Sequence, residues 1–244
     1  MAALASTTVA ILAGGLGTRI RPVLGEVPKL LATMAGKPFL DHLLAWLAPH
    51  KPATILLCLG HGATLILDYV EKHALPVVTV VEPAPLGTAG ALRFALAGRK
   101  ITPLLVLNGD TMLKGDLTPF FQAHQESGAL GSLLCVAMEE CQRYGTLTLD
   151  ETQRIVRFVE KDEHHQGGGF ISSGILYLQP PLVEALLASQ GNSLERDFLA
   201  CLPAGTLLGY PVAWPFIDFG VPDSYYQADD FFSQMDTVGG NLLP

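Results

Sequence analysis

Short, uninterrupted apolar runs in the first half of the chain constrain its fold more than any other feature. They span residues 9–13, 54–59, 77–81 and 104–107. Such runs are typical of strands buried on both faces of a parallel sheet, because a strand with one solvated face alternates apolar and polar residues. Apolar residues at helical spacing lie between the runs, for example Phe39, Leu40, Leu43 and Leu47. The first half is therefore predicted to be a doubly wound, mostly parallel α/β sheet.

The pattern changes beyond residue 130. Three predicted strands, 132–138, 145–149 and 155–160, follow one another with turn-like breaks, which is typical of an antiparallel or mixed section. A strand over 170–178 follows the glycine-rich stretch 166–169, and helices are predicted to begin at Pro181 and Ser193. No sequence typical of a linker divides the chain. We expect one domain over residues 1–238, made of halves 7–125 and 126–238, and a flexible tail over 239–244.

Composition and charge exclude several classes of protein. Of the 244 residues, 49% are hydrophobic and 16% are charged, and the formal net charge is −8. A chain this apolar requires a large buried core, which excludes intrinsic disorder. No apolar run approaches the roughly 18 residues that a membrane-spanning helix needs, and an acidic chain lacks the basic face of a nucleic-acid binder. We therefore expect neither a membrane nor a nucleic acid as a partner.

The cysteines and histidines favour no metal or redox site. Cys58, Cys135, Cys141 and Cys201 are widely spaced without a C-x-x-C pair, which predicts buried free thiols and a cytoplasmic protein. The first residues lack the basic region of a signal peptide. None of the seven histidines belongs to a His-x-x-x-His pair. His164-His165 is interpreted as part of an exposed loop. His61 is interpreted as a surface-turn residue, although its place after a strand would also suit contact with a ligand.

A glycine-rich turn, Gly14-Gly15-Leu16-Gly17-Thr18-Arg19, follows the first predicted strand. In an open parallel sheet, ligands bind beyond the carboxyl ends of the strands, where turn amides favour anions. Arg19 and Lys29 offer a guanidinium and an ammonium group to phosphate oxygens. Two common nucleotide motifs do not fit. The dinucleotide fingerprint requires glycine where Ile20 stands, and a P-loop requires serine or threonine where Pro38 stands.

Two aspartates are candidate metal ligands. Asp110 follows a predicted strand in Leu107-Asn108-Gly109-Asp110, and Asp218 lies in an apolar stretch. By residue type alone, Asp110 fits an ordinary turn as well as it fits a metal site. Magnesium needs only one or two carboxylates beside phosphate oxygens and water, so two acids from distant positions suffice.

Together these motifs resemble the sugar-1-phosphate nucleotidyltransferases. The family signature Leu-x-Gly-Gly-x-Gly-Thr-Arg-Leu/Ile followed by Pro-Lys is present at residues 12–20 and 28–29. Further matching motifs lie at 36–40, 86–90, 107–110, 143–145, 160–161 and 216–222. Residues 143–146, 158–161 and 216–222 are most similar to the D-glycero-D-manno-heptose 1-phosphate guanylyltransferase branch. The resemblance implies a Rossmann-like fold of the nucleotide-diphospho-sugar transferase type, in which 7–125 binds the nucleotide and 126–238 binds the sugar phosphate.

The resemblance also implies a role for each matching residue. Arg19 and Lys29 would be the catalytic cations, and Asp110 and Asp218 would hold Mg²⁺. The nucleotide would lie against Leu12, Ala13, Gly14, Gly15, Gly17, Thr18, Gly87, Thr88 and Asn108. The sugar phosphate would lie against Gly109, Tyr144, Gly145, Glu160, Lys161, Ser172 and Gly174. Asparagine often stands in the family where this chain has Ser172, so recognition of the sugar hydroxyls is expected to differ.

The expected reaction joins a sugar 1-phosphate to a nucleoside triphosphate and releases pyrophosphate, in nucleotide-sugar biosynthesis for cell-surface polysaccharides. Heptose 1-phosphate and GTP fit the resemblance best. A mannose-1-phosphate guanylyltransferase and a uridylyl- or thymidylyltransferase stay open, because Gly87-Thr88-Ala89 does not by itself select a base. A non-catalytic nucleotide-sugar sensor stays open as a different class. The aromatic stripe at residues 225–232 is interpreted as packing or as part of a homodimer interface.

Overall fold

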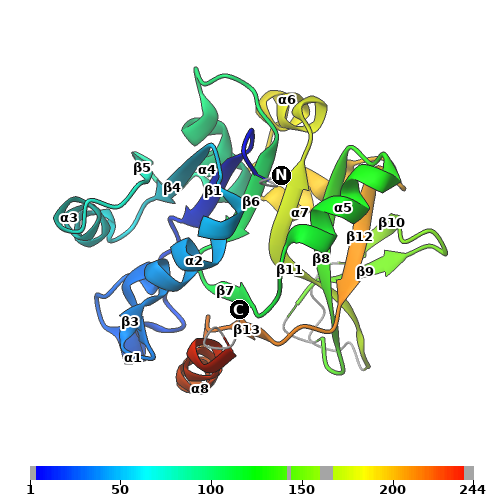
Figure 1. The fold of residues 1–244 in the computed structure, drawn as a ribbon. Helices are drawn as coiled ribbons and strands as arrows, with labels where there is room; N and C mark the ends of the chain where they lie inside the picture. Colours follow the sequence, from blue (N-terminus) through cyan, green and yellow to red (C-terminus); the bar gives the residue numbers. More distant parts are fainter. Residues whose placement is uncertain (1–3, 142–143, 160–166, 239–244) are drawn as a thin grey trace, which may run out of the picture.

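The computed structural model describes residues 4–141, 144–159 and 167–238. Within these residues a nine-stranded sheet forms the centre of the molecule (Figure 1). Seven of its strands lie in the order β10-β9-β11-β6-β1-β4-β5, with β8 beside β11 and β12 beside β8. The molecule is therefore organised around one continuous sheet.

Parallel strands form the first half of this sheet. They are β1 (Thr8–Ala13), β4 (Thr54–Leu59), β5 (Val78–Val81) and β6 (Leu104–Asn108). β1 pairs in parallel with both β4 and β6, and β5 pairs in parallel with β4. The predicted parallel section is confirmed, and its strand ends differ from the prediction by at most one residue.

The second half adds the mixed section that the sequence predicts. Its strands are β8 (Gly131–Met138), β9 (Thr146–Leu149), β10 (Ile155–Val159), β11 (Gly169–Leu178) and β12 (Leu207–Val212). β11 runs antiparallel to β6, β8 and β9, whereas β12 runs parallel to β8. The pairing of β11 with β6 joins the two halves edge to edge.

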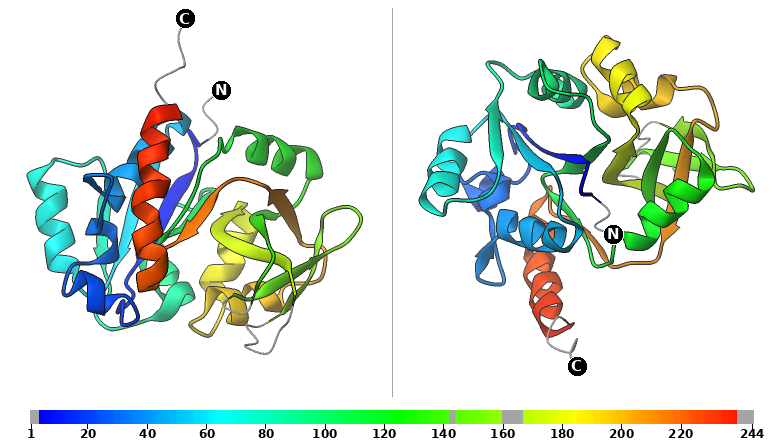
Figure 2. Two further views of the ribbon diagram at one scale, coloured as in Figure 1. Left: turned by 90° about the horizontal axis from the view of Figure 1, so that it is seen from below. Right: turned by 45° about the horizontal axis from the view of Figure 1, so that its top comes forward.

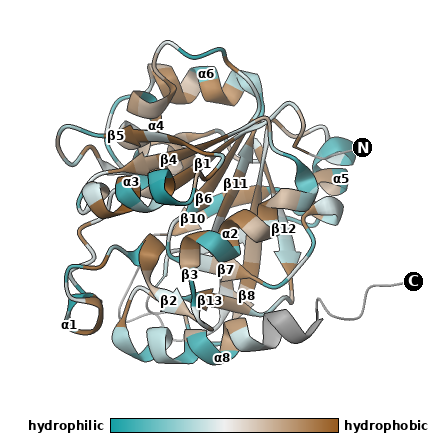
Figure 3. Ribbon diagram, turned by 60° about the vertical axis from the view of Figure 1, so that its left-hand side comes forward, coloured by the Kyte–Doolittle hydropathy of each residue, from teal (hydrophilic) through white to brown (hydrophobic). Residues whose placement is uncertain are grey.

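Helices cover both faces of the sheet (Figure 2). One core includes residues of α2 (Phe39–Leu47), α3 (Ala63–Lys72), α5 (Thr118–Ser127) and α8 (Pro222–Val238). The other includes residues of α4 (Gly87–Leu96), α6 (Pro180–Ala188) and the short α7 (Leu194–Asp197). Val9 and Ile11 of β1 belong to the first core and Ala10 to the second. The central strands are apolar throughout for this reason (Figure 3).

Several short elements were not predicted from the sequence. They are α1 (Arg21–Leu24), η1 (Lys29–Leu31), β2 (Thr33–Met34), β3 (Lys37–Pro38), η2 (Ala48–His50), β7 (Thr111–Leu113), η3 (Leu199–Cys201) and β13 (Phe216–Asp218). The longer α5, β12 and α8 were not predicted either. β7 pairs antiparallel with β13, and β2 pairs antiparallel with β3. The β7–β13 pair lies next to the site described below.

The aromatic stripe on α8 packs mainly within the chain. Phe232 is fully buried, and its ring centroid lies 5.9 Å from that of Phe39 on α2. Phe231 and Tyr225 are partly buried against the same core. Tyr226 remains 65% exposed. The interpretation as packing is confirmed for three of these rings, which leaves Tyr226 for any contact between subunits.

The cysteines are free thiols, as predicted. Cys58, Cys135 and Cys141 are buried, whereas Cys201 is exposed and differs from the prediction. Burial raises the pKa of the Cys58 and Cys135 thiols to about 12, so both are protonated at neutral pH. Among the described residues, no helix is both long and apolar enough to cross a membrane.

Candidate active site

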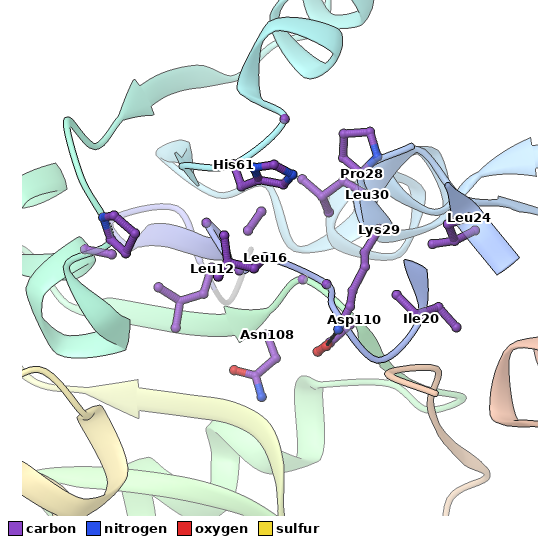
Figure 4. A pocket seen from close by; sticks show the side chains of 18 of the residues that line it. Leu12, Leu16, Ile20, Leu24, Pro28, Lys29, Leu30, His61, Asn108 and Asp110 are labelled. Atoms are coloured by element: carbon purple, nitrogen blue, oxygen red, sulfur yellow. Dashed lines mark hydrogen bonds and ion pairs between the residues drawn. The ribbon is translucent and has the colours of Figure 1, made fainter. Parts of the chain in front are cut away.

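A cleft of about 380 Å³ lies beyond the carboxyl ends of the parallel strands (Figure 4). Open parallel sheets bind ligands at this edge. Of the residues predicted to contact the nucleotide, those that line the cleft are Leu12, Ala13, Gly14, Gly15, Gly17, Gly87, Thr88 and Asn108. Thr18 is exposed on the same turn and is not among the lining residues of the described chain. The structure therefore brings nearly the whole predicted set together.

The glycines of the turn have different roles. A Cβ at Gly14 would lie 2.7 Å from Oε1 of Glu82, so the glycine leaves room for the Glu82 carboxylate in its present position. Gly17 has a φ of 61°, and its carbonyl accepts a hydrogen bond of 3.0 Å from the N–H of Arg21. Nothing lies within 4 Å of a Cβ placed at Gly15. The backbone at Gly15 is therefore open to close approach by a phosphate group.

Four charged side chains meet around Gly220. Nζ of Lys29 donates a hydrogen bond of 2.6 Å to Oδ2 of Asp110 (Figure 4). Oδ1 of Asp218 accepts a hydrogen bond of 2.8 Å from the N–H of Gly220. A Cβ at Gly220 would lie 3.0 Å from that oxygen and 3.7 Å from both a guanidinium nitrogen of Arg19 and Nζ of Lys29. The predicted catalytic cations and metal-binding acids are thus neighbours in space.

Strand pairing places the two aspartates side by side. Asp110 immediately precedes β7, and the antiparallel register puts Thr111 of β7 opposite Asp218 of β13. The N–H of Phe219 donates a hydrogen bond of 3.2 Å to the carbonyl of Asp110. The Phe219 ring is fully buried, 4.7 Å from the ring of Phe39. A buried aromatic anchor therefore holds the segment that carries Asp218.

The chemistry of these acids fits a magnesium ion. Carboxylates are hard oxygen ligands, and magnesium commonly takes one or two of them together with substrate phosphates and water. Among the described residues, no group of three or more His, Cys, Asp and Glu side chains could form a closed metal site. Two carboxylates fit an open magnesium site, whose remaining ligands are phosphate oxygens and water.

The predicted sugar-phosphate residues lie partly in the cleft. Gly109 lines it, and its N–H donates a hydrogen bond of 2.9 Å to the carbonyl of Leu12. Gly174 has a φ of 79°, and a Cβ there would lie 2.5 Å from the amide nitrogen of Asn108. Oγ of Ser172 accepts a hydrogen bond of 3.1 Å from the N–H of Gly174. Ser172 therefore supports the backbone of β11 beside Asn108.

The remaining predicted residues belong to the region before and after β9 and β10. Tyr144 and Gly145 immediately precede β9. The ring of Tyr144 lies 6.5 Å from that of Phe216, two residues before Asp218. Glu160 and Lys161 lie outside the described residues.

Glu82 is a cleft residue that sequence reasoning missed. It follows β5, and its N–H donates a hydrogen bond of 2.8 Å to the carbonyl of Leu59. Oε2 accepts a hydrogen bond of 3.1 Å from the N–H of Leu86. A Cβ at Gly60 would lie 2.6 Å from Oε1. Its position directly after a parallel strand could have identified it as a cleft residue, because the carboxyl ends of parallel strands lie at one edge of the sheet.

Four further polar residues line the cleft, namely His61, Arg21, Glu26 and Glu195. His61 is exposed but contributes to the wall, so its interpretation as a surface-turn residue alone is incomplete. Arg21 and Glu26 form an exposed ion pair, and hydrogen bonding and charge from Arg21 lower the pKa of the Glu26 carboxyl. Glu195, from the second half of the chain, also lines the cleft, and no sequence motif identified it.

Comparison with known proteins agrees with this geometry. Residues 8–234 match the Nucleotidyl transferase family. The chain belongs to this family. The predicted family and fold class are confirmed, and so is the prediction of an enzyme.

Several relatives resemble this nucleotidyl transferase over most of its length. It is 32% identical over 221 residues to D-glycero-alpha-D-manno-heptose 1-phosphate guanylyltransferase of Aneurinibacillus thermoaerophilus, which covers 89% of this chain and 95% of that protein. It is 30% identical over 223 residues to mannose-1-phosphate guanyltransferase of Yarrowia lipolytica, covering 88% of this chain and 61% of that one. The crystal structure of HddC from Yersinia pseudotuberculosis has a TM-score of 0.78 and 33% identity, and the match covers 92% of this chain and 99% of HddC. A second HddC structure, in complex with GMP-PN, matches equally well.

Proposed function

We propose that this nucleotidyl transferase joins heptose 1-phosphate to GTP and releases pyrophosphate and a GDP-sugar. The arrangement in the cleft carries the proposal. An open glycine turn lies beside Lys29 and Asp110 at one end, and Glu82 lies among the lining residues after β5. Similarity to the heptose 1-phosphate guanylyltransferase, and to HddC crystallised with GMP-PN, supports the choice of substrates.

Glu82 supports guanine as the base. The Watson–Crick edge of guanine presents two adjacent donors, N1–H and the 2-amino group. A carboxylate is an acceptor-only group with several lone pairs, so Glu82 can accept from both donors while Oε2 still accepts from Leu86. Uracil and thymine present one donor between two carbonyl oxygens, which a carboxylate would repel. The same residue therefore favours GTP and disfavours UTP and dTTP.

The proposed mechanism is an in-line displacement at the α-phosphorus of GTP. A phosphate oxygen of the sugar 1-phosphate forms the new P–O bond, and the bond to the pyrophosphate oxygen breaks. Catalysis comes from holding two anions together and neutralising their charge. Lys29 and Arg19 would bind phosphate oxygens, and Asp110 and Asp218 would hold Mg²⁺, whose charge stabilises the transferring phosphates when it is bound. The displacement needs no nucleophile from the protein.

Mannose 1-phosphate is the second candidate acceptor. The Yarrowia lipolytica relative is a mannose-1-phosphate guanyltransferase at 30% identity, although the chain spans only 61% of its length. Ser172 stands where asparagine is common in similar enzymes, so recognition of the sugar hydroxyls at this position is expected to differ. The choice between heptose and mannose therefore stays open.

A panel assay tests the proposal. The purified protein is incubated with Mg²⁺, one of GTP, ATP, UTP or dTTP, and the 1-phosphate of heptose, mannose or glucose. Pyrophosphate release gives kcat/KM, and mass spectrometry identifies the nucleotide-sugar. We expect the highest kcat/KM for GTP with heptose 1-phosphate. Turnover of UTP or dTTP without turnover of GTP would contradict the guanylyl assignment. Binding of a GDP-sugar without any turnover would favour the sensor.

We further propose that the enzyme is cytoplasmic and acts in nucleotide-sugar supply for cell-surface polysaccharides. The three buried free thiols fit a reducing compartment.

A homodimer is also proposed, through a contact that includes Tyr226, which is 65% exposed on α8. Sedimentation velocity of Tyr226→Arg beside the unmodified protein tests this contact. A monomeric profile of the unmodified protein at micromolar concentration would contradict it.

A further inference from the structure

One cleft residue comes from the half of the molecule that carries the predicted sugar-phosphate site. Glu195 lines the cleft, and the other lining residues in the described chain all fall between Leu12 and Asp110. Glu195 is exposed and lies in the first turn of α7.

Residues 191–195, termed the strap, are bound to the start of α4. The N–H of Leu194 donates a hydrogen bond of 2.7 Å to Oγ1 of Thr88. The N–H of Ala89 donates a hydrogen bond of 2.9 Å to the carbonyl of Asn192. Leu194 is itself buried, at 3% exposure. The hydroxyl oxygen of Thr88 therefore holds the strap in place.

The strap approaches α4 so closely that glycine is required at the contact. Gly87 has a φ of 73°, and a Cβ there would lie 2.5 Å from the carbonyl oxygen of Asn192. The strap is also tied to its own helix. Oδ2 of Asp197 accepts hydrogen bonds of 2.9 Å from the N–H groups of both Asn192 and Ser193. Bonds on both sides thus position Glu195 at the cleft.

The carboxylates that line the cleft differ in their partners. Three have partners in the structure, namely Glu26 with Arg21, Asp110 with Lys29, and Glu82 with the N–H of Leu86. Among the described residues, the Glu195 carboxylate has no hydrogen-bond or ion-pair partner. A carboxylate can only accept hydrogen bonds, and it repels phosphate oxygens. Its complement in an occupied cleft is an uncharged hydrogen-bond donor, and the contacts of the strap with Gly87 and Thr88, which are predicted to bind the nucleotide, favour the nucleoside as that donor.

We propose that Glu195 binds the nucleoside of the triphosphate by accepting a hydrogen bond from a ribose hydroxyl or from the base amino group. Thr88 is then a positioning residue that holds the strap. The inference rests on the proposed use of GTP. It makes the second half of the chain part of the nucleotide site, so Glu195 contributes to selection of the triphosphate.

Substrate analogues test the role of Glu195. kcat/KM is measured for GTP, 2′-deoxy-GTP, 3′-deoxy-GTP and ITP, which lacks the 2-amino group, in the unmodified enzyme, Glu195→Ala and Glu195→Gln. Loss of a hydrogen bond to a charged acceptor is expected to lower kcat/KM for GTP by about 10- to 100-fold in Glu195→Ala. For the analogue that lacks the bonded donor, the Glu195→Ala substitution is expected to lower kcat/KM by less than about twofold. If the ratio of kcat/KM for GTP to that for a deoxy-GTP falls in Glu195→Ala, the bonded donor is a ribose hydroxyl. If the ratio of kcat/KM for GTP to that for ITP falls, the bonded donor is the 2-amino group of the base.

Two further variants separate recognition from a structural defect. Thr88→Val removes the acceptor for the N–H of Leu194 and is expected to reduce the same ratio as Glu195→Ala. Glu184→Gln, at an exposed glutamate of α6 outside the cleft lining, is the matched control and is expected to change no ratio. If every ratio in Glu195→Ala stays within twofold of the unmodified value, the proposal is wrong.

The test also distinguishes this inference from the proposed function. Calorimetric titration with the same four nucleotides, without a sugar phosphate, gives the selectivity ratios in binding alone. If the protein binds GTP without transferring it, the proposed function is wrong. In that case Glu195→Ala is still expected to lower one ratio of binding affinities if Glu195 binds the nucleoside. Unchanged binding ratios together with normal transfer overturn the inference and leave the proposed function intact.

Discussion

Glu82 shows how single residues shape the cleft. Its carboxylate fits between the ends of β1 and β4 because Gly14 and Gly60 have no Cβ. The N–H of Leu86 donates a hydrogen bond to Oε2 of this carboxylate. A glutamine of the same size would present one donor and one acceptor in place of two acceptors. Under the proposed function, this residue therefore sets the preference for the base.

Glu82→Gln is expected to change the choice of triphosphate. A pair of hydrogen bonds to a base edge contributes about 1–3 kcal/mol of discrimination. The ratio of kcat/KM for GTP to that for UTP is therefore expected to fall by about 10- to 100-fold. The panel assay with both triphosphates measures it, and Glu26→Gln, at a glutamate paired with Arg21, is the control. An unchanged ratio in Glu82→Gln would remove Glu82 from base recognition.

The charges around Gly220 give a second prediction. Arg19→Ala and Lys29→Ala each remove a cation proposed to bind the phosphates, and Asp110→Asn removes a carboxylate proposed to hold Mg²⁺. Each is expected to lower kcat by about 10²–10³-fold, as for loss of one preorganised donor at a reacting centre. Far-UV circular dichroism is expected to stay unchanged, because Arg19 is exposed and Lys29 and Asp110 bind each other in the cleft rather than in the core. A near-normal kcat in any of the three would contradict its assigned role.

At the scale of elements, α8 secures the strand that carries Asp218. The helix begins at Pro222, four residues after Asp218, and it also binds the β2–β3 hairpin, where Oδ1 of Asp229 accepts a hydrogen bond of 2.7 Å from the N–H of Ala35. Phe232 inserts into the core beside Phe39. Loosening α8 would therefore affect both stability and the position of an active-site acid.

Phe232→Ala is expected to lower the free energy of unfolding by about 3–5 kcal/mol, the usual cost of removing a buried aromatic ring. Urea denaturation measures the change. Gln227→Ala on the same helix is the control, because its side chain is exposed. We expect that control to change stability by about 0.5 kcal/mol or less. Equal losses in the two variants would show that Phe232 is not an anchor of α8.

The elements that sequence reasoning found and missed differ in what stabilises them. β1, β4 and β6 were predicted to within one residue, because burial on both faces requires an apolar run that is visible locally. β7 and β13 have three residues each and exist through pairing between segments about a hundred residues apart, as Thr111 with Asp218. Asp110 and Asp218 were assigned by resemblance, but that pairing is what brings them together. Glu195 was missed because its place depends on the hydrogen bond from Leu194 to Thr88.

At the scale of the whole molecule, the two halves share one sheet and one core. β11 of the second half pairs with β6 of the first, and one core combines Leu107 and Phe39 with Ile175 and Phe232. The proposed active site crosses the same boundary, through Asp218 and Glu195. Both the fold and the site therefore depend on the junction between the halves.

This junction predicts a single cooperative unfolding transition, although chains above about 150 residues often unfold through intermediates. Both tryptophans report on the junction at Gly115. The indole N–H of Trp46 donates a hydrogen bond of 2.7 Å to the Gly115 carbonyl, and a Cβ at Gly115 would overlap the ring of Trp214. Tryptophan fluorescence is therefore expected to change at the same urea concentration as far-UV circular dichroism. A fluorescence midpoint clearly below the dichroism midpoint would mean that the halves separate before they unfold, which contradicts a single domain over residues 1–238.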